Sequence, residues 1–345
     1  MERYAQWWNG YPGISLRGGA MNPRVSIAGK KFSRSPASRA HQAGVGLVEL
    51  MISLVLGLLI TAMAVQMFST SRSTVSTQEA LSYLQESARY VSFRLQPLMR
   101  NVGYAGCANS RDITNASSVD DSHDLTAPFG GQQRTQRSLS YFNLTFVAAS
   151  KDGDETTLIS SMTSLGGPLS VRNGSEAAFV TDEFALVSDC NSTDVFKVSG
   201  TTQGSIETND TLSRSYGSSQ SSNAYLYPVQ AWELRLDDQA NDSSVRALYL
   251  DRIDATFARE ELASGVEGFD VSFSLDTTGN GSVDRVKVPA ATVRSEDRWD
   301  EVRRIEIALT LESLPGVVPG GDNDGRLTRT FNLTFTPRNL QLRGS

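Results

Sequence analysis

Imidazole chemistry in this chain is limited to two histidines, His41 and His123. His123 lies beside three aspartates, Asp120, Asp121 and Asp124. A metal site needs more ligands in a defined geometry, so we interpret this stretch as a solvated loop. The sequence carries no G-x-S-x-G, H-E-x-x-H, P-loop or Rossmann fingerprint. We therefore predict that the protein is not an enzyme, although carboxylate-based chemistry stays open.

Thiol chemistry depends on Cys107 and Cys190, the two cysteines of the chain. Two cysteines are too few for a disulfide-dense scaffold or a four-cysteine zinc site. In an oxidising compartment a structural disulfide is the default, and two reduced buried thiols are the alternative. Closing this loop of 83 positions would stabilise the fold by about 4–5 kcal/mol in the chain-entropy model.

Oxygen side chains between Asp276 and Asp284 have the spacing of a calcium loop. They stand at loop positions one, three, five and nine, with glycine at position six; these residues are Asp276, Thr278, Asn280 and Asp284. Lys287 stands at position twelve, where a calcium loop has its bidentate acid. Asn280-Gly281 is also a strong hairpin-turn signal. We expect no metal and interpret the stretch as a β-turn, with calcium binding as the alternative.

The elements that must position these residues begin with an apolar segment from Val45 to Phe68, whose one charged residue is Glu49. The 22 residues from Leu50 to Ser71 have no charged side chain. As a helix, Leu50–Phe68 would span about 28 Å, which matches a bilayer core of about 30 Å. The segment is too long and too uniformly apolar for the buried helix of a soluble protein. We therefore predict a single transmembrane helix.

Charge is divided unevenly on the two sides of this helix. Residues 1–44 hold seven basic residues and one acid, a net of +6, which leaves −12 on the other 301 residues because the whole chain carries −6. Short basic flanks stay cytoplasmic, so the body after Phe68 is expected outside the cytoplasm. A net-acidic chain is a poor candidate for nucleic-acid binding. Met21 offers a second start, which would make residues 1–20 an upstream mis-start.

The residues at the start of the apolar segment resemble the class III signal of type IV prepilins. The matching stretch runs from His41-Gln42-Ala43-Gly44 into Val45-Gly46-Leu47-Val48-Glu49. In that family a peptidase cuts after the glycine and methylates the new amine, which implies cleavage between Gly44 and Val45 and methylation of Val45. An ordinary secretory signal, cut after Ala62-Met63-Ala64, is the alternative. A carboxylate inside the apolar segment argues against it.

The resemblance also implies a role for Glu49, which falls on the fifth mature position. A carboxylate that enters a low-dielectric phase needs a partner. In the family this partner is the positive N-terminal amine of a neighbouring subunit, and the pair sets the axial register during assembly. The alternative is a carboxylate at the membrane interface, with its head in water and stabilised by the helix N-terminus.

A helical pattern continues beyond the apolar segment. Apolar residues recur at spacings of three and four on one face; they are Leu81, Leu84, Ala88, Val91, Leu95 and Leu98. We predict one continuous helix from about Gly46 to about Leu95, ended or kinked near Gln96 because Pro97 disfavours helix before and at its position.

The rest of the chain predicts an antiparallel, β-rich head. Polar residues predict a loop at 106–140, and a Ser/Thr/Gly-rich stretch predicts a long mobile loop at 199–223. Strands are predicted at 141–147, 194–198 and 224–236. Strict alternation predicts three further strands with one buried face; the inward rows are Phe269, Val271, Phe273 and Leu275, then Ile305, Ile307, Leu309 and Leu311, then Phe331, Leu333 and Phe335.

The C-terminal pattern resembles the PilW family of minor pilins. It includes GVEGFDVSFSLDTTGNGSVDRVKV and RTFNLTFTPRNLQLR, and NVGYAGC and SDC also fit. The resemblance implies an α+β, pilin-like fold in which a long N-terminal helix packs on an antiparallel β-rich head. The implied segments are a leader at 1–44, a transmembrane half-helix at 45–68, an amphipathic half-helix at 69–100 and a periplasmic head at 101–345.

The family further implies a low-abundance subunit that helps to initiate type IV pilus assembly and stays at or near the fibre tip, with twitching motility as a cellular readout. Implied partners are other minor pilins, the major pilin, the prepilin peptidase, the inner-membrane assembly platform and a tip adhesin; no cofactor is implied. The alternatives are a large type II secretion pseudopilin, a secreted enzyme and a membrane-tethered adhesive module. Loss of pili on deletion would separate the first alternative from a pilin, since a pseudopilin would instead be needed for exoprotein secretion.

Overall fold

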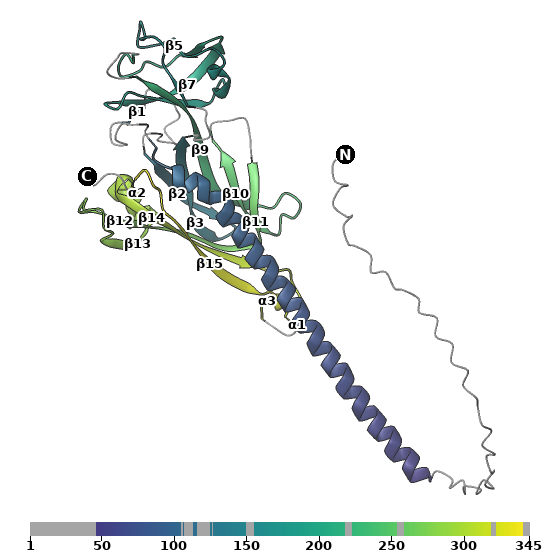
Figure 1. The fold of residues 1–345 in the computed structure, drawn as a ribbon. Helices are drawn as coiled ribbons and strands as arrows, with labels where there is room; N and C mark the ends of the chain where they lie inside the picture. The colour runs from purple at the N-terminus through teal and green to yellow at the C-terminus, as the bar shows by residue number, and fades with distance from the viewer. Residues whose placement is uncertain are drawn as a thin grey trace, which may run out of the picture. The chain divides into compact units, whose positions relative to one another are not determined.

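The computed structural model describes residues 46–104, 106, 113–115, 125, 127–149, 155–217, 223–253, 259–318 and 322–340. The chain divides into two compact units, Met1–Thr61 and Ala62–Ser345. The fold is α+β, with one long N-terminal helix and a large antiparallel β-rich head (Figure 1). This architecture confirms the fold class predicted from the apolar segment and the alternating strands.

The long helix, α1, spans Leu47–Asn101 and contains Pro97. The predicted helix end near Gln96 is therefore wrong by about one turn, while the alternative of a kink at Pro97 stays a prediction. Pro97 removes one intrahelical hydrogen bond, but Leu95 and Met99 on either side of it are completely buried. Their packing against the head holds the last turn in helical form, and tertiary contacts outweigh the local preference.

Among the described residues, the larger sheet has eleven strands, which differ widely in length. Its path runs β11-β10-β9-β6-β7-β8-β5, with β3 and β4 also paired to β9, β2 to β3, and β1 parallel to β7. Its strands are β1 (Ile113–Asn115), β2 (Phe129–Gln136), β3 (Leu139–Ala149), β4 (Thr156–Thr157), β5 (Leu169–Ser170), β6 (Phe184–Ser188), β7 (Thr193–Thr202), β8 (Ser205–Thr208), β9 (Tyr225–Asp238), β10 (Arg246–Arg252) and β11 (Arg259–Ser264).

The smaller sheet has the order β13-β12-β14-β15 and is antiparallel throughout. Its strands are β12 (Val266–Leu275), β13 (Arg285–Pro289), β14 (Val302–Glu312) and β15 (Thr328–Phe335). The inward rows predicted for β12 and β14 are buried, as alternation requires. Short helical segments complete the head: η2 (Ser175–Ala178), α2 (Ala290–Glu296), η3 (Trp299–Glu301) and α3 (Asp322–Gly325).

One hydrophobic core joins the second half of α1 to both sheets. The helix contributes a buried stripe at spacings of three and four; its members are Leu84, Ala88, Val91, Leu95 and Met99. At the centre of the core, the ring centroids of Phe273 and Trp299 lie 5.4 Å apart, and those of Phe129 and Phe273 lie 5.6 Å apart. A second core lies in the lobe around β5 and β7 (Figure 1) and includes Phe196 and Tyr216.

Two predicted loops contain regular structure instead. The stretch 106–140 includes β1, β2 and the start of β3, and 199–223 includes the end of β7 and all of β8. Leu212 and Tyr216, inside the second stretch, are buried in the lobe core. Composition misleads here because polar and glycine residues have weak strand propensity, while pairing with a neighbouring strand and burial of a few apolar side chains decide the structure.

Candidate functional site

The predicted processing residues Gly44 and Val45 lie outside the described residues, as do His41, Cys107 and His123. Glu49 is described and stands in the first turn of α1. Its backbone N–H donates to the carbonyl of Gly46 at 2.9 Å, and its side chain is exposed. A carboxylate in the first helical turn is stabilised by the partial positive charge of the helix N-terminus.

The first half of α1 presents a continuous apolar surface. Among the described residues, α1 is the one helix long and apolar enough to cross a membrane. Its large side chains between Leu47 and Phe68 are exposed, and Leu47 and Met67 each leave more than three quarters of their surface uncovered. Such a surface is stable in lipid or against other apolar helices rather than in water.

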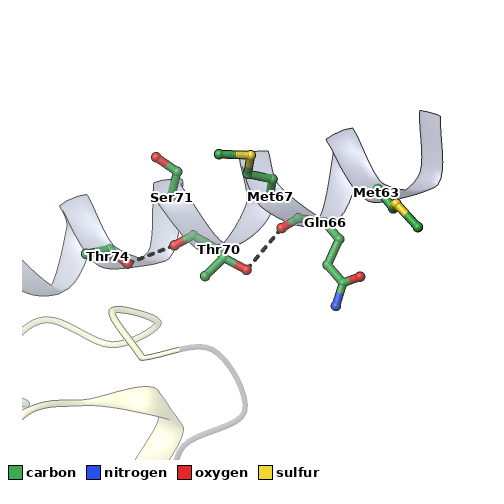
Figure 2. Close-up of a pocket in the computed structure, with 6 residues that line it drawn as sticks. All are labelled: Met63, Gln66, Met67, Thr70, Ser71 and Thr74. Carbon is green, nitrogen blue, oxygen red and sulfur yellow. Dashed lines mark hydrogen bonds between the residues drawn. The ribbon is translucent and has the colours of Figure 1, made fainter. Parts of the chain in front are cut away.

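Polar side chains, among them the hydroxyl groups of Thr70, Ser71 and Thr74, follow the apolar surface on α1. Figure 2 shows Gln66, Thr70 and Thr74 on successive turns, with the Thr70 hydroxyl donating to the Gln66 carbonyl and that of Thr74 to the Thr70 carbonyl, each at 3.0 Å. Met63, Met67 and Ser71 also line this shallow hollow. All six residues come from a single helix, so the hollow is an open helix face and not an enclosed cavity.

The second half of α1 is held to β11 by polar contacts as well as by the core. The Tyr90 hydroxyl donates to Glu260 Oε1 at 2.6 Å, and Arg94 Nη2 lies 2.9 Å from Glu260 Oε2. The hydrogen bond to Glu260 raises the pKa of Tyr90. Tyr83 and Ser264 also meet, hydroxyl to hydroxyl, at 3.1 Å. These contacts fix the helix against one edge of the larger sheet.

The predicted calcium-loop residues form the connection between β12 and β13. Asp276 accepts N–H bonds from Gly279 at 2.7 Å and Gly281 at 2.8 Å, while Asp284 accepts N–H bonds from Thr277 and Thr278. The side chains of Thr278 and Asn280 belong to the same loop, where Thr278 Oγ1 donates to Asp276 at 3.3 Å. Within the described residues, no group of three or more His, Cys, Asp or Glu side chains is placed to hold a metal.

Asp276 also forms a buried ion pair that the sequence analysis missed. Arg303 Nη2 lies 3.1 Å from Asp276 Oδ2, and both side chains are buried. Burial by itself would raise the pKa of Asp276, but the N–H groups of Gly281 and Gly279 and the Arg303 guanidinium outweigh it and lower the pKa. A signal for this pair exists, since Arg303 occupies the inward phase of the row Ile305, Ile307, Leu309. An inward arginine in an apolar row requires a buried acceptor.

Cys190 lies in the turn between β6 and β7 with a φ of 69°, and it is not a free thiol. Because Cys107 lies outside the described residues, the predicted pairing of the two cysteines stays a prediction. Calcium binding at the Asp276 loop likewise stays the alternative interpretation. In the structure, Asp276 accepts loop N–H groups and pairs with Arg303.

The first half of α1 is apolar and exposed, its second half is buried on the head, and the head is antiparallel and β-rich. This is the α+β architecture that the resemblance to pilins implies. Residues 236–339 match the family model of PilW, described as Type IV Pilus-assembly protein W. The match runs from the end of β9 through β15, and it confirms the resemblance to the PilW family. The description of that family supports a role in type IV pilus assembly. No curated protein matches the chain.

Proposed function

We propose that the mature chain is a minor pilin, which helps to initiate type IV pilus assembly and is incorporated at or near the pilus tip with other minor pilins. The observation that carries this proposal is the PilW match over residues 236–339. The exposed apolar half of α1 supports it, because an assembling subunit must exchange lipid contacts for contacts with other helices.

Maturation in this proposal follows from the class III signal. The leader 1–44 stays in the cytoplasm, the peptidase cuts between Gly44 and Val45, and the Val45 amine is methylated. Residues 45–68 then anchor the chain in the inner membrane, and the head lies in the periplasm, where Cys107 and Cys190 form a disulfide.

Glu49 is the assembly residue in this scheme. Its carboxylate would pair with the N-terminal amine of a neighbouring subunit as the helix leaves the membrane. Because charges attract strongly in a low-dielectric environment, this pair favours one axial position of the subunit over the others. The neighbours are other minor pilins and the major pilin, brought together by the inner-membrane assembly platform. A tip adhesin is a further partner.

The test removes the carboxylate of Glu49 and measures how much of the chain is incorporated into pili. We expect Glu49→Ala to be processed normally but to lose at least about tenfold of its incorporation into sheared pili, because an unpaired amine in an apolar helix bundle costs more than one hydrogen bond. Glu86→Ala is the matched control, since Glu86 is an exposed acid in the second half of the same helix. Immunoblots of membrane and sheared-fibre fractions provide the measurement.

Wild-type incorporation of Glu49→Ala would contradict the register role. Deletion of the whole chain gives the second arm. Loss of pili and twitching with normal exoprotein secretion supports the pilin, whereas normal piliation with lost secretion would replace it by a type II secretion pseudopilin.

A further inference from the structure

The last strand of the smaller sheet has one side without a partner among the described strands. β15 stands at the end of the order β13-β12-β14-β15 and pairs with β14 alone among the described strands. Its eight residue pairs with β14 continue without a register shift. Most of its residues are exposed, and Phe331 and Leu333 are half-buried. β15 is therefore a long, regular edge strand.

The hydrogen-bond phase of this edge follows from one contact just before the strand. The N–H of Ser313 donates to the carbonyl of Leu327 at 2.9 Å, which makes 313–327 a hydrogen-bonded pair in the same register as β14 and β15. Such pairs alternate along an antiparallel ladder. The N–H and C=O groups that point to the free side are therefore those of Thr328, Thr330, Asn332 and Thr334.

Other described edges carry features that block strand addition, and β15 does not. β13 has five residues, a shifted register against β12, and Lys287 at a φ of 52°. β11 carries three adjacent charged residues, and its Glu260 is held by α1. β2 contains Gly130 and Gly131, the latter at a φ of 131°. Natural edges are usually protected by charge, proline, bulges or a covering element, and β15 has neither proline nor a bulge.

We propose that the free edge of β15 binds an extended strand of a different protein of the pilus, which adds to the smaller sheet as a fifth strand. This inference rests on the proposed function, because the choice of occupant depends on membrane anchoring. Backbone groups of Thr328 to Thr334 would supply the affinity, as in other cases of strand addition.

A second copy of this chain is a poor occupant. Two β15 strands that pair in antiparallel fashion with their apolar faces on one side are related by a two-fold axis perpendicular to the sheet. That axis reverses every direction in the plane of the sheet. It therefore also reverses the second half of α1, which packs along the sheet in the main core (Figure 1). Two copies anchored in one membrane through the same helix cannot have opposite directions.

The two faces of β15 define the chemistry of the added strand. On the inner face, Phe331 and Leu333 pack against the main core but stay half-exposed, and Arg329 lies over the Phe331 ring at 6.0 Å. A partner strand would cover them with apolar side chains and place an acid opposite Arg329. On the outer face, Thr330 and Thr310 meet hydroxyl to hydroxyl at 2.8 Å, so small polar residues fit there.

The test uses a substitution that removes an outward N–H without touching the ladder. Asn332→Pro deletes the N–H that faces the free side, and proline is tolerated at such positions of edge strands. Asn332→Ala changes the same side chain and keeps the N–H, so it is the matched control. The full-length chain is co-produced in cells with each prepilin-signal protein of its own organism, one pair at a time. Each pair is then extracted and purified in detergent.

We expect at least one pair to form a complex in which β15 amides exchange more slowly with deuterium than in the chain alone. Asn332→Pro should weaken this complex at least about tenfold, and Asn332→Ala less than about threefold. Both variants should melt near the wild-type temperature. If Asn332→Pro melts much lower, Thr330→Pro, which removes another outward N–H, replaces it.

Three results would overturn the proposal: equal affinity of the proline variant, unchanged exchange of β15 in the complex, or no complex with any prepilin-signal protein. Its failure is distinct from failure of the proposed function, because the complex is measured without fibres. Normal pili on deletion of the chain would reject the pilin role even where β15 binds a strand.

Discussion

At the scale of single residues, Arg303 and Asp276 hold together three parts of the head. Arg303 stands at the start of β14, and Asp276 directly follows the last residue of β12. Arg303 Nη1 also donates to the carbonyl of Leu340 after β15. Both carboxylate oxygens of Asp276 also accept hydrogen bonds from N–H groups of the loop, which are those of Gly279 and Gly281. Removing one member of such a buried pair leaves the other without compensation.

The pH dependence of this pair can be derived from the direction of its shift. The pKa of Asp276 in the folded head is below its ordinary value, so the carboxylate stabilises the fold above the unfolded pKa of about 3.9, and that stabilisation is lost as pH falls through the folded pKa. We expect Asp276→Asn to lower the melting temperature by about 5 °C at pH 7. The difference from wild type should shrink toward pH 2.

Thermal melts of the full chain from pH 7 to pH 2 provide the measurement. Asp270→Asn is the control, because Asp270 is an exposed acid on the same strand. A difference between wild type and Asp276→Asn that stays constant over this range would show that the carboxylate charge does not stabilise the head.

At the scale of elements, the period of the apolar residues predicted those helices and strands that bury one face. The apolar stripe of α1 and the inward rows of β12 and β14 were predictable because each repeats over three or more turns or pairs. β2 was not, since FGGQQRTQ has low strand propensity and depends on β3 for its pairing. The contact between α1 and Glu260 joins Arg94 and Glu260, which are 166 positions apart in the sequence. No local pattern could indicate that contact.

The buried stripe of α1 should carry most of the attachment of the helix to the head. Leu95 is completely buried, so we expect Leu95→Ala to lower the free energy of unfolding of the head by about 2–5 kcal/mol, from lost burial and the cavity left behind. Arg89→Ala on the exposed face should change it by less than about 0.5 kcal/mol. Urea denaturation of the detergent-solubilised full chain measures both, and similar values for the two would place the attachment elsewhere.

At the scale of the whole molecule, the chain carries two opposed charges separated by one apolar segment. Residues 1–44 carry a net charge of +6, and the remaining 301 residues carry a net charge of −12. In the proposed topology this division orients the helix during insertion, because short basic flanks stay on the cytoplasmic side of a membrane. Once the helix is in place, the leader would put positive charge at the end of a helix that must pack among others.

Removal of that leader is the prediction that belongs to this scale. We expect the protein isolated from membranes and sheared fibres to begin at Val45 and to carry one methyl group on its amine, because Gly44 precedes the cut and Glu49 stands four residues beyond the new terminus. N-terminal peptide mass spectrometry identifies the terminus, and a Gly44→Leu variant should retain the leader and stay in the membrane fraction. A mature terminus at Val65 would instead mean an ordinary secretory signal, with Glu49 lost from the functional protein and the assembly role lost with it.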